Sequence, residues 1–125
     1  MSYNVARNVN PNLAICSFTS SGVGNVTFSY INGDFTPSIA SDVITLDAGF
    51  EYFIISTPTI TVATNYKHII DGVDQTTYSV TATSTTSGLD ENTSSIQADA
   101  SATFSLYADQ SVTENSRLQI WRFPL

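Results

Sequence analysis

The chain has 125 residues, and its four basic and 11 acidic residues give a formal net charge of −7. This length fits one domain with a hydrophobic core that needs neither a disulfide nor a metal ion. The basic residues are few and scattered, which argues against binding to nucleic acid or to an anionic membrane, since both require clustered Lys and Arg. No apolar run approaches the ~20 residues of a membrane-spanning helix.

The chain reads as a polar arm followed by one β domain. Residues 1–11 contain few core-forming residues and are expected to form an N-terminal arm, with a single domain over 12–125. Strand-like segments separated by turn signals are expected, in chain order, at 13–19, 23–31, 42–47, 50–57, 59–64, 67–70, 77–83, 96–107 and 118–123, with a polar loop over 84–95. No stretch has a helical period, so the predicted fold is all-β: an antiparallel β-sandwich of the jelly-roll type or another Greek-key sandwich.

Two of these segments, 50–55 and 118–123, carry large apolar side chains on both faces. Residues 50–55 place Phe50, Tyr52 and Ile54 on one face, with Phe53 and Ile55 on the other. A small sandwich covers one face of each sheet with its own core, so the second face is predicted to contact another subunit. The alternative is a loop that folds over these aromatic residues. The candidate interface residues are Phe50, Tyr52, Phe53, Ile55, Phe104, Tyr107, Trp121 and Phe123.

Three segments resemble one known family. Ile44-Thr45-Leu46-Asp47-Ala48-Gly49-Phe50-Glu51-Tyr52 is similar to the entry into a central strand of jelly rolls like tumour necrosis factor and the globular head of the complement recognition protein. Residues 102–107 (ATFSLY) resemble a late strand of that fold. Residues 116–123 (SRLQIWRF) resemble its closing strand, as it occurs in phage structural proteins. The resemblance covers about residues 40–125.

The resemblance implies a homotrimer in which aromatic-rich strands meet at the three-fold axis. It also implies a structural protein of a virus particle, either a capsid decoration or a head-fibre or knob protein, docked to other virion proteins through the arm at 1–11. The chain departs from the family in having no collagen-like stalk, coiled coil or paired-acid calcium site. We expect a virion location after synthesis in a host cytoplasm, because the first residues lack the apolar stretch of a signal peptide.

Residue types offer little for catalysis. His68 is the only histidine, and no nucleophile motif accompanies it, so it is expected to be a strand residue with a partly solvated ring. Cys16 lies in an apolar run and is expected to be a buried, inert thiol. The acidic turns at 71–74 and 90–92 offer oxygen ligands for calcium but are expected to be solvated bends. The predictions are therefore no enzyme activity, no catalytic residue, no metal and no cofactor.

A binding function is the alternative to a purely structural one. Tyr66, Tyr78 and the loops rich in Ser, Thr and Asn would supply stacking and hydrogen bonds to a glycan on a host surface. The protein would then be the receptor-binding or carbohydrate-binding tip of a phage fibre. A tip usually follows a long trimeric shaft, which this chain does not contain, so decoration is favoured.

Overall fold

The computed structural model describes residues 11–40, 42–59, 62–80 and 92–125, of which residues 76–80, 92 and 113–115 are described by their backbone alone. The described residues contain strands and no α-helix. The strands are β1 (Asn12–Ser20), β2 (Gly24–Asn25), β3 (Thr27–Gly33), β4 (Ser38–Ala40), β5 (Val43–Leu46), β6 (Phe50–Thr57), β7 (Thr64–Ile70), β8 (Val73–Val80), β9 (Asn92–Ala98), β10 (Ala102–Ala108) and β11 (Val112–Pro124). The all-β prediction is confirmed.

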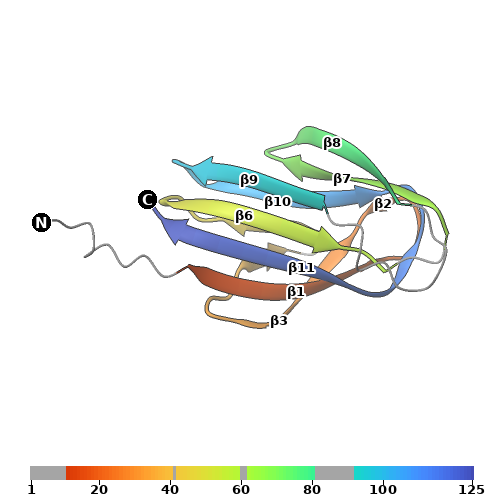
Figure 1. Ribbon diagram of the computed structural model, residues 1–125, viewed down its shortest axis with the longest axis horizontal. Helices are drawn as coiled ribbons and strands as arrows, with labels where there is room; N and C mark the ends of the chain where they lie inside the picture. The colour runs from red at the N-terminus through yellow and green to blue at the C-terminus, as the bar shows by residue number, and fades with distance from the viewer. Residues whose placement is uncertain (1–10, 41, 60–61, 81–91) are drawn as a thin grey trace, which may run out of the picture.

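The strands form two antiparallel sheets packed face to face as a sandwich (Figure 1). A five-stranded sheet has the order β3-β1-β11-β6-β9, and a six-stranded sheet contains the path β4-β5-β10-β7-β8, with β2 also paired to β10. Strands that are distant in sequence are therefore neighbours in space: the first long strand, β1, pairs with the last, β11. The antiparallel β-sandwich is thus the architecture of the described chain.

The core lies between the two sheets because side chains alternate along each strand. In β6 the inward positions are Tyr52, Ile54 and Ser56, and in β10 they include Phe104 and Leu106, all buried. The ring centroids of Phe18 and Phe28, both in the five-stranded sheet, lie 6.2 Å apart, and the ring of Phe28 connects the layers by lying 6.0 Å from that of Phe104 in the other sheet. One continuous core therefore joins both sheets within the predicted domain. Of the predicted arm at 1–11, residues 1–10 lie outside the described ranges.

Several predicted strand boundaries need correction. The segment predicted at 96–107 is two strands, β9 and β10, separated by a bend at 99–100. Residues 59, 62 and 63 of the segment predicted at 59–64 lie outside any strand, and Thr64 begins β7. Asp99 and Pro58 account for part of this, since both residue types interrupt regular strands. The segment at 50–57 matches β6 in full.

Gly33 occupies a position that only glycine fits. Its φ is +150°, and a Cβ added there would lie 2.3 Å from the carbonyl oxygen of Leu13 on β1. Because that oxygen also accepts a 2.7 Å hydrogen bond from the Asp34 amide, it has little freedom to move away. The same end of the strand pair is fixed by a 3.0 Å bond from the Leu13 amide to the Asp34 carboxylate.

The substitution Gly33→Ala is expected to lower the free energy of unfolding by about 1–3 kcal/mol, since it combines an unfavourable φ with a backbone clash. Urea denaturation followed by tryptophan fluorescence measures this. Gly22→Ala is the matched control, because nothing lies within 4 Å of a Cβ at that position. The control should shift stability by less than about 1 kcal/mol. Equal effects of the two substitutions would contradict the close approach of β3 and β1.

Candidate functional site

The outer face of the five-stranded sheet carries an apolar patch built from three neighbouring strands. We call it the outer apolar face, and it consists of Leu13 and Ile15 of β1, Phe53 and Ile55 of β6, and Trp121 and Phe123 of β11. Strand register brings these side chains together: Leu13 lies opposite Trp121, which in turn lies opposite Phe53. A second row joins Ile15 and Ile55 through Gln119. Phe53 is 41% exposed, and the other five are half-buried.

Trp121 is arranged to present apolar area. Its indole N–H donates a 3.1 Å hydrogen bond to the side-chain oxygen of Gln119, two residues earlier on the same face of β11. The polar end of the side chain is therefore satisfied within the chain, and the ring offers mainly apolar surface to its surroundings. Aromatic side chains with a satisfied polar end are common at protein interfaces.

Four of the eight predicted interface residues lie on this face: Phe53, Ile55, Trp121 and Phe123. Sequence reasoning missed Leu13 and Ile15. The signal was present in the run Leu13-Ala14-Ile15-Cys16, which is apolar at successive positions. In the structure Ala14 and Cys16 are fully buried, so Leu13 and Ile15 point outward.

Tyr52 and Phe104 require correction as interface residues. Tyr52 is 1% exposed and Phe104 is 0% exposed, so both belong to the core between the sheets and offer no surface to a partner. Tyr107 is half-buried on the outer face of the six-stranded sheet, on the opposite side of the sandwich, so it does not belong to the outer apolar face. Tyr52 and Phe104 lie on β6 and β10, and both side chains point inward between the sheets.

Phe50 takes part in a different contact at one end of the sandwich. The guanidinium carbon of Arg122 lies 4.2 Å from the centroid of the Phe50 ring and 3.9 Å from that of Phe35. This places the cation between two aromatic faces, an arrangement with favourable cation–π energy. One guanidinium nitrogen of Arg122 lies 3.9 Å from the exposed Asp47 carboxylate. Phe50 therefore serves this intramolecular cluster rather than the outer apolar face.

His68 is fully buried, which corrects the prediction of a partly solvated ring. Its Nε2 forms a 2.7 Å hydrogen bond with Ser56 Oγ of β6, and its Nδ1 forms a 2.7 Å bond with Ser94 Oγ of β9. The His68 and Phe104 rings pack edge to face, with their centroids 4.9 Å apart. Since His68 belongs to the six-stranded sheet and both serines to the other, the histidine links the two layers. Burial lowers the pKa of His68 from 6.5 to about 3.

This Ser–His–Ser arrangement shares its residue types with a catalytic serine–histidine pair, but it differs in solvent access and in hydrogen-bond partners. Ser56 is 0% exposed, and Phe104 covers the ring of His68, so a substrate has no access to the hydroxyl. Both ring nitrogens are already engaged with hydroxyl groups, where a catalytic triad would place a carboxylate on one of them. The geometry therefore fits a buried structural link. Cys16 is also buried, as predicted, and burial raises the pKa of its thiol to about 11.

Both carboxylates of the acidic turn at 71–74 form contacts within the protein. Asp71 accepts a 2.9 Å hydrogen bond from the Thr103 amide, and Asp74 forms a 2.6 Å ion pair with Lys67. Within the described ranges, no three His, Cys, Asp or Glu side chains are grouped so as to hold a metal ion. The second acidic turn, at 90–92, falls largely outside the described residues.

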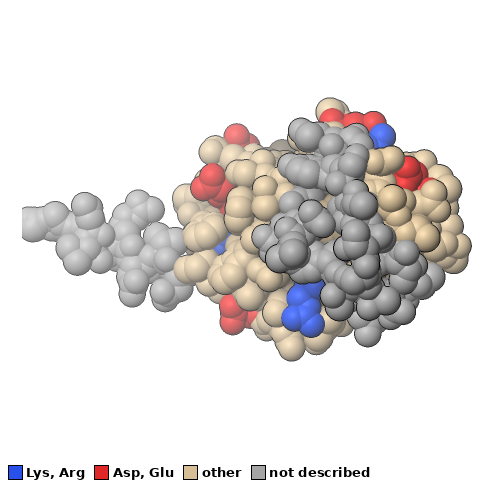
Figure 2. All heavy atoms as spheres, turned by 45° about the vertical axis from the view of Figure 1, so that its right-hand side comes forward, with Lys and Arg blue, Asp and Glu red and all other residues tan. Residues whose placement is uncertain are grey.

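Acidic side chains lie at several separate places on the visible face of the molecule, with few basic ones among them (Figure 2). In the described part of the chain, no helix is both long and apolar enough to cross a membrane. Comparison with protein-family models and with curated proteins finds no match to this chain.

Proposed function

We propose that this chain is a non-enzymatic structural subunit that assembles as a homotrimer through the outer apolar face. The main support is the cross-strand row Leu13–Trp121–Phe53, in which three large apolar side chains lie side by side on the surface of a sheet. Depletion of charge and enrichment in aromatic residues are typical of the centre of a protein–protein interface. Covering this face with a copy of itself removes its apolar area from water.

The order of strands supports assigning the sandwich to the jelly-roll type. If β2, β3 and β4, which lie between β1 and β5 in the chain, are set aside, four strands remain in each sheet, in the orders β1-β11-β6-β9 and β5-β10-β7-β8. This arrangement fits a long antiparallel ribbon wound into two Greek keys. Together with the resemblance over residues 40–125, it favours the trimeric jelly rolls of phage structural proteins over an unrelated sandwich.

Within that class we infer a capsid decoration or a head-fibre or knob protein of a virus particle. The net charge of −7 suits a soluble particle surface, because self-repulsion limits precipitation. The arm at 1–11 is the proposed attachment to other virion proteins. β1 begins directly after it, and Asn12 at the start of β1 pairs with Arg122 near the end of β11, so the point of attachment of the arm lies at one end of the sandwich.

Light scattering tests the trimer. The purified chain should have about three times the monomer mass of 13.5 kDa. Phe53→Lys places a charge at the most exposed position of the outer apolar face and should yield monomers, since burying an unpaired charge is strongly unfavourable. Val73→Lys, at a 62% exposed position that begins β8 away from this face, is the control and should keep the trimer. A monomeric wild-type chain would overturn the proposal, and a stable dimer would overturn its three-fold part.

Deletion of residues 1–11 tests the virion role. The shortened chain should assemble with the same number of subunits as the full-length chain, because the domain at 12–125 contains the outer apolar face. It should no longer attach when mixed with virus particles that lack this protein. Co-sedimentation with such particles measures attachment. Retention of full attachment by the shortened chain would show that the arm is not the docking segment.

A further inference from the structure

A hollow of about 120 Å³ lies on the outer face of the six-stranded sheet, on the opposite side of the sandwich from the outer apolar face. It is lined by Asn65, Tyr66 and Lys67 of β7 and by Tyr107 and Asp109 at the end of β10. Tyr107 pairs with Lys67 across the two strands, so both point outward at the same level. Tyr66 is buried, and its ring belongs to the core, which removes it as the stacking residue expected from sequence. The side chain of Tyr78 is among those not described.

The polar groups around the hollow are held in place. The Asp109 carboxylate accepts two hydrogen bonds from Asn65, at 2.8 Å from the backbone amide and at 3.0 Å from the side-chain amide. A third bond, from the Asp109 amide to the Asn65 carbonyl at 3.1 Å, closes the pair. Each carboxylate oxygen retains capacity to accept another hydrogen bond. The hollow therefore has a fixed acceptor group at one side.

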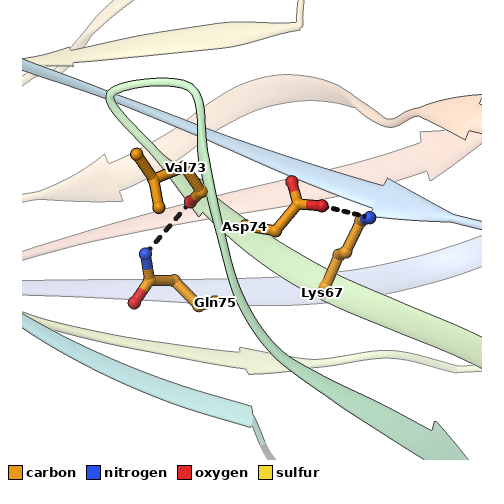
Figure 3. A network of polar contacts seen from close by, with 4 residues as sticks. All are labelled: Lys67, Val73, Asp74 and Gln75. Atoms are coloured by element: carbon orange, nitrogen blue, oxygen red, sulfur yellow. Dashed lines mark hydrogen bonds and ion pairs between the residues drawn. The ribbon is translucent and has the colours of Figure 1, made fainter.

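Lys67 is the fixed donor at the other side. Its ammonium group forms a 2.6 Å ion pair with Asp74 on β8 (Figure 3) and lies 5.2 Å from the centroid of the Tyr107 ring. An ammonium group carries three N–H donors, so this ion pair leaves further donors for a ligand. Because Asp74 balances the charge of Lys67, Asp109 leaves the local charge negative, within a chain of net charge −7. An anionic ligand is disfavoured here.

We propose that this hollow binds one neutral pyranose ring of a glycan. The partly exposed Tyr107 ring offers an apolar face for the C–H face of a sugar, while Asp109 accepts from hydroxyl groups and Lys67 donates to them. The volume is below the roughly 300–1,000 Å³ of pockets for larger ligands, which fits a single ring and millimolar affinity. A trimer would present three such sites on its outward surfaces and so gain avidity. The site itself lies within one chain and does not depend on assembly.

Ligand-observed NMR with a panel of neutral methyl pyranosides, and with a methyl glucuronide as the anionic probe, tests the site. Saturation transfer to at least one neutral pyranoside, with no transfer to the glucuronide, is the expected result. Tyr107→Leu should weaken binding at least about tenfold, whereas Tyr107→Phe, which keeps the ring, should retain it. Thermal unfolding of both variants establishes that they are folded. No transfer to any neutral pyranoside up to about 50 mM would overturn the proposal, as would equal binding by Tyr107→Leu.

A second pair of variants separates this proposal from that of the trimer. Trp121→Leu alters the outer apolar face and should weaken association without changing monosaccharide binding. Tyr107→Leu should have the opposite pattern, weakening binding while leaving the mass of the assembly unchanged. Loss of sugar binding in Trp121→Leu would contradict a site contained in one chain. A monomeric protein that binds the sugar would refute the trimer and support the hollow.

Discussion

Replacing Phe104 by alanine is expected to lower the free energy of unfolding by about 3–5 kcal/mol, the range for deleting a large buried aromatic side chain. Phe104 is 0% exposed, and its ring lies 6.0 Å from that of Phe28 in the other sheet and 4.9 Å from that of His68. Removing the ring leaves a cavity between two layers whose backbones are fixed by their sheet hydrogen bonds. Urea denaturation at one protein concentration measures the loss.

Val73→Ala provides the comparison for Phe104→Ala. Val73 is also an apolar residue of the six-stranded sheet, but it is 62% exposed at the start of β8. Its truncation should change stability by less than about 0.5 kcal/mol. A loss below about 1 kcal/mol for Phe104→Ala would mean that the ring is not part of a packed core. The sequence-based placement of Phe104 at a subunit interface would then have to be reconsidered.

The strands with clear alternation were predictable from the sequence, but the face of each strand that points to the core was not. In residues 50–55 both faces are apolar, so hydrophobicity alone does not say whether Tyr52 or Phe53 faces the core. The register with β11 decides it: Ile54 pairs with Ile120 and both are fully buried, which turns Phe53 outward beside Trp121. Such cross-strand pairing is a long-range property that local periodicity does not contain.

The inward polar residues were the least predictable part of the structure. Ser56 follows the apolar run of β6 and gives no sign of burial, yet it is 0% exposed because it meets His68 across the sandwich. A histidine between Lys67 and Ile69 was expected to touch solvent. Burial of such groups becomes favourable only when hydrogen-bond partners arrive from the opposite sheet. That arrangement depends on tertiary structure, so sequence position carries no signal for it.

The hollow on the six-stranded sheet was likewise not evident from the chain. Asn65 lies on β7 and Asp109 directly after the end of β10, 44 residues away in the chain. The glycan hypothesis named tyrosines because of their chemistry, and its choice of Tyr66 failed because that residue points inward. Tyr107, placed by sequence reasoning at the subunit interface, is the tyrosine that the strand pairing brings beside Lys67. Residue type alone therefore did not identify the tyrosine at the hollow, because the sheet topology determines which tyrosine lies there.

Acidification is expected to destabilise this protein through His68. The unfolded chain binds a proton at this histidine near its ordinary pKa of 6.5, whereas the folded chain binds one only at about pH 3. Between these values the unfolded state holds more protons, so stability is fully present above pH 6.5 and is lost as the pH falls. The slope is about 1.4 kcal/mol per pH unit, which amounts to about 2 kcal/mol at pH 5 relative to pH 7. Urea denaturation at half-unit intervals from pH 7.5 to pH 4 measures this loss.

The variant His68→Gln isolates the contribution of the histidine. Glutamine does not titrate, and it keeps hydrogen-bonding atoms for Ser56 and Ser94, so the variant should be less stable at pH 7 but should lack the slope between pH 6.5 and pH 5. The carboxylates are common to both proteins and largely cancel in the difference, and His68 is the only histidine in the chain. Parallel pH profiles for the two proteins would show that the imidazole is not held neutral by burial. A converging pair of profiles, with wild type losing its advantage as the pH falls, would establish the buried link between the two sheets as the acid-sensitive point of the fold.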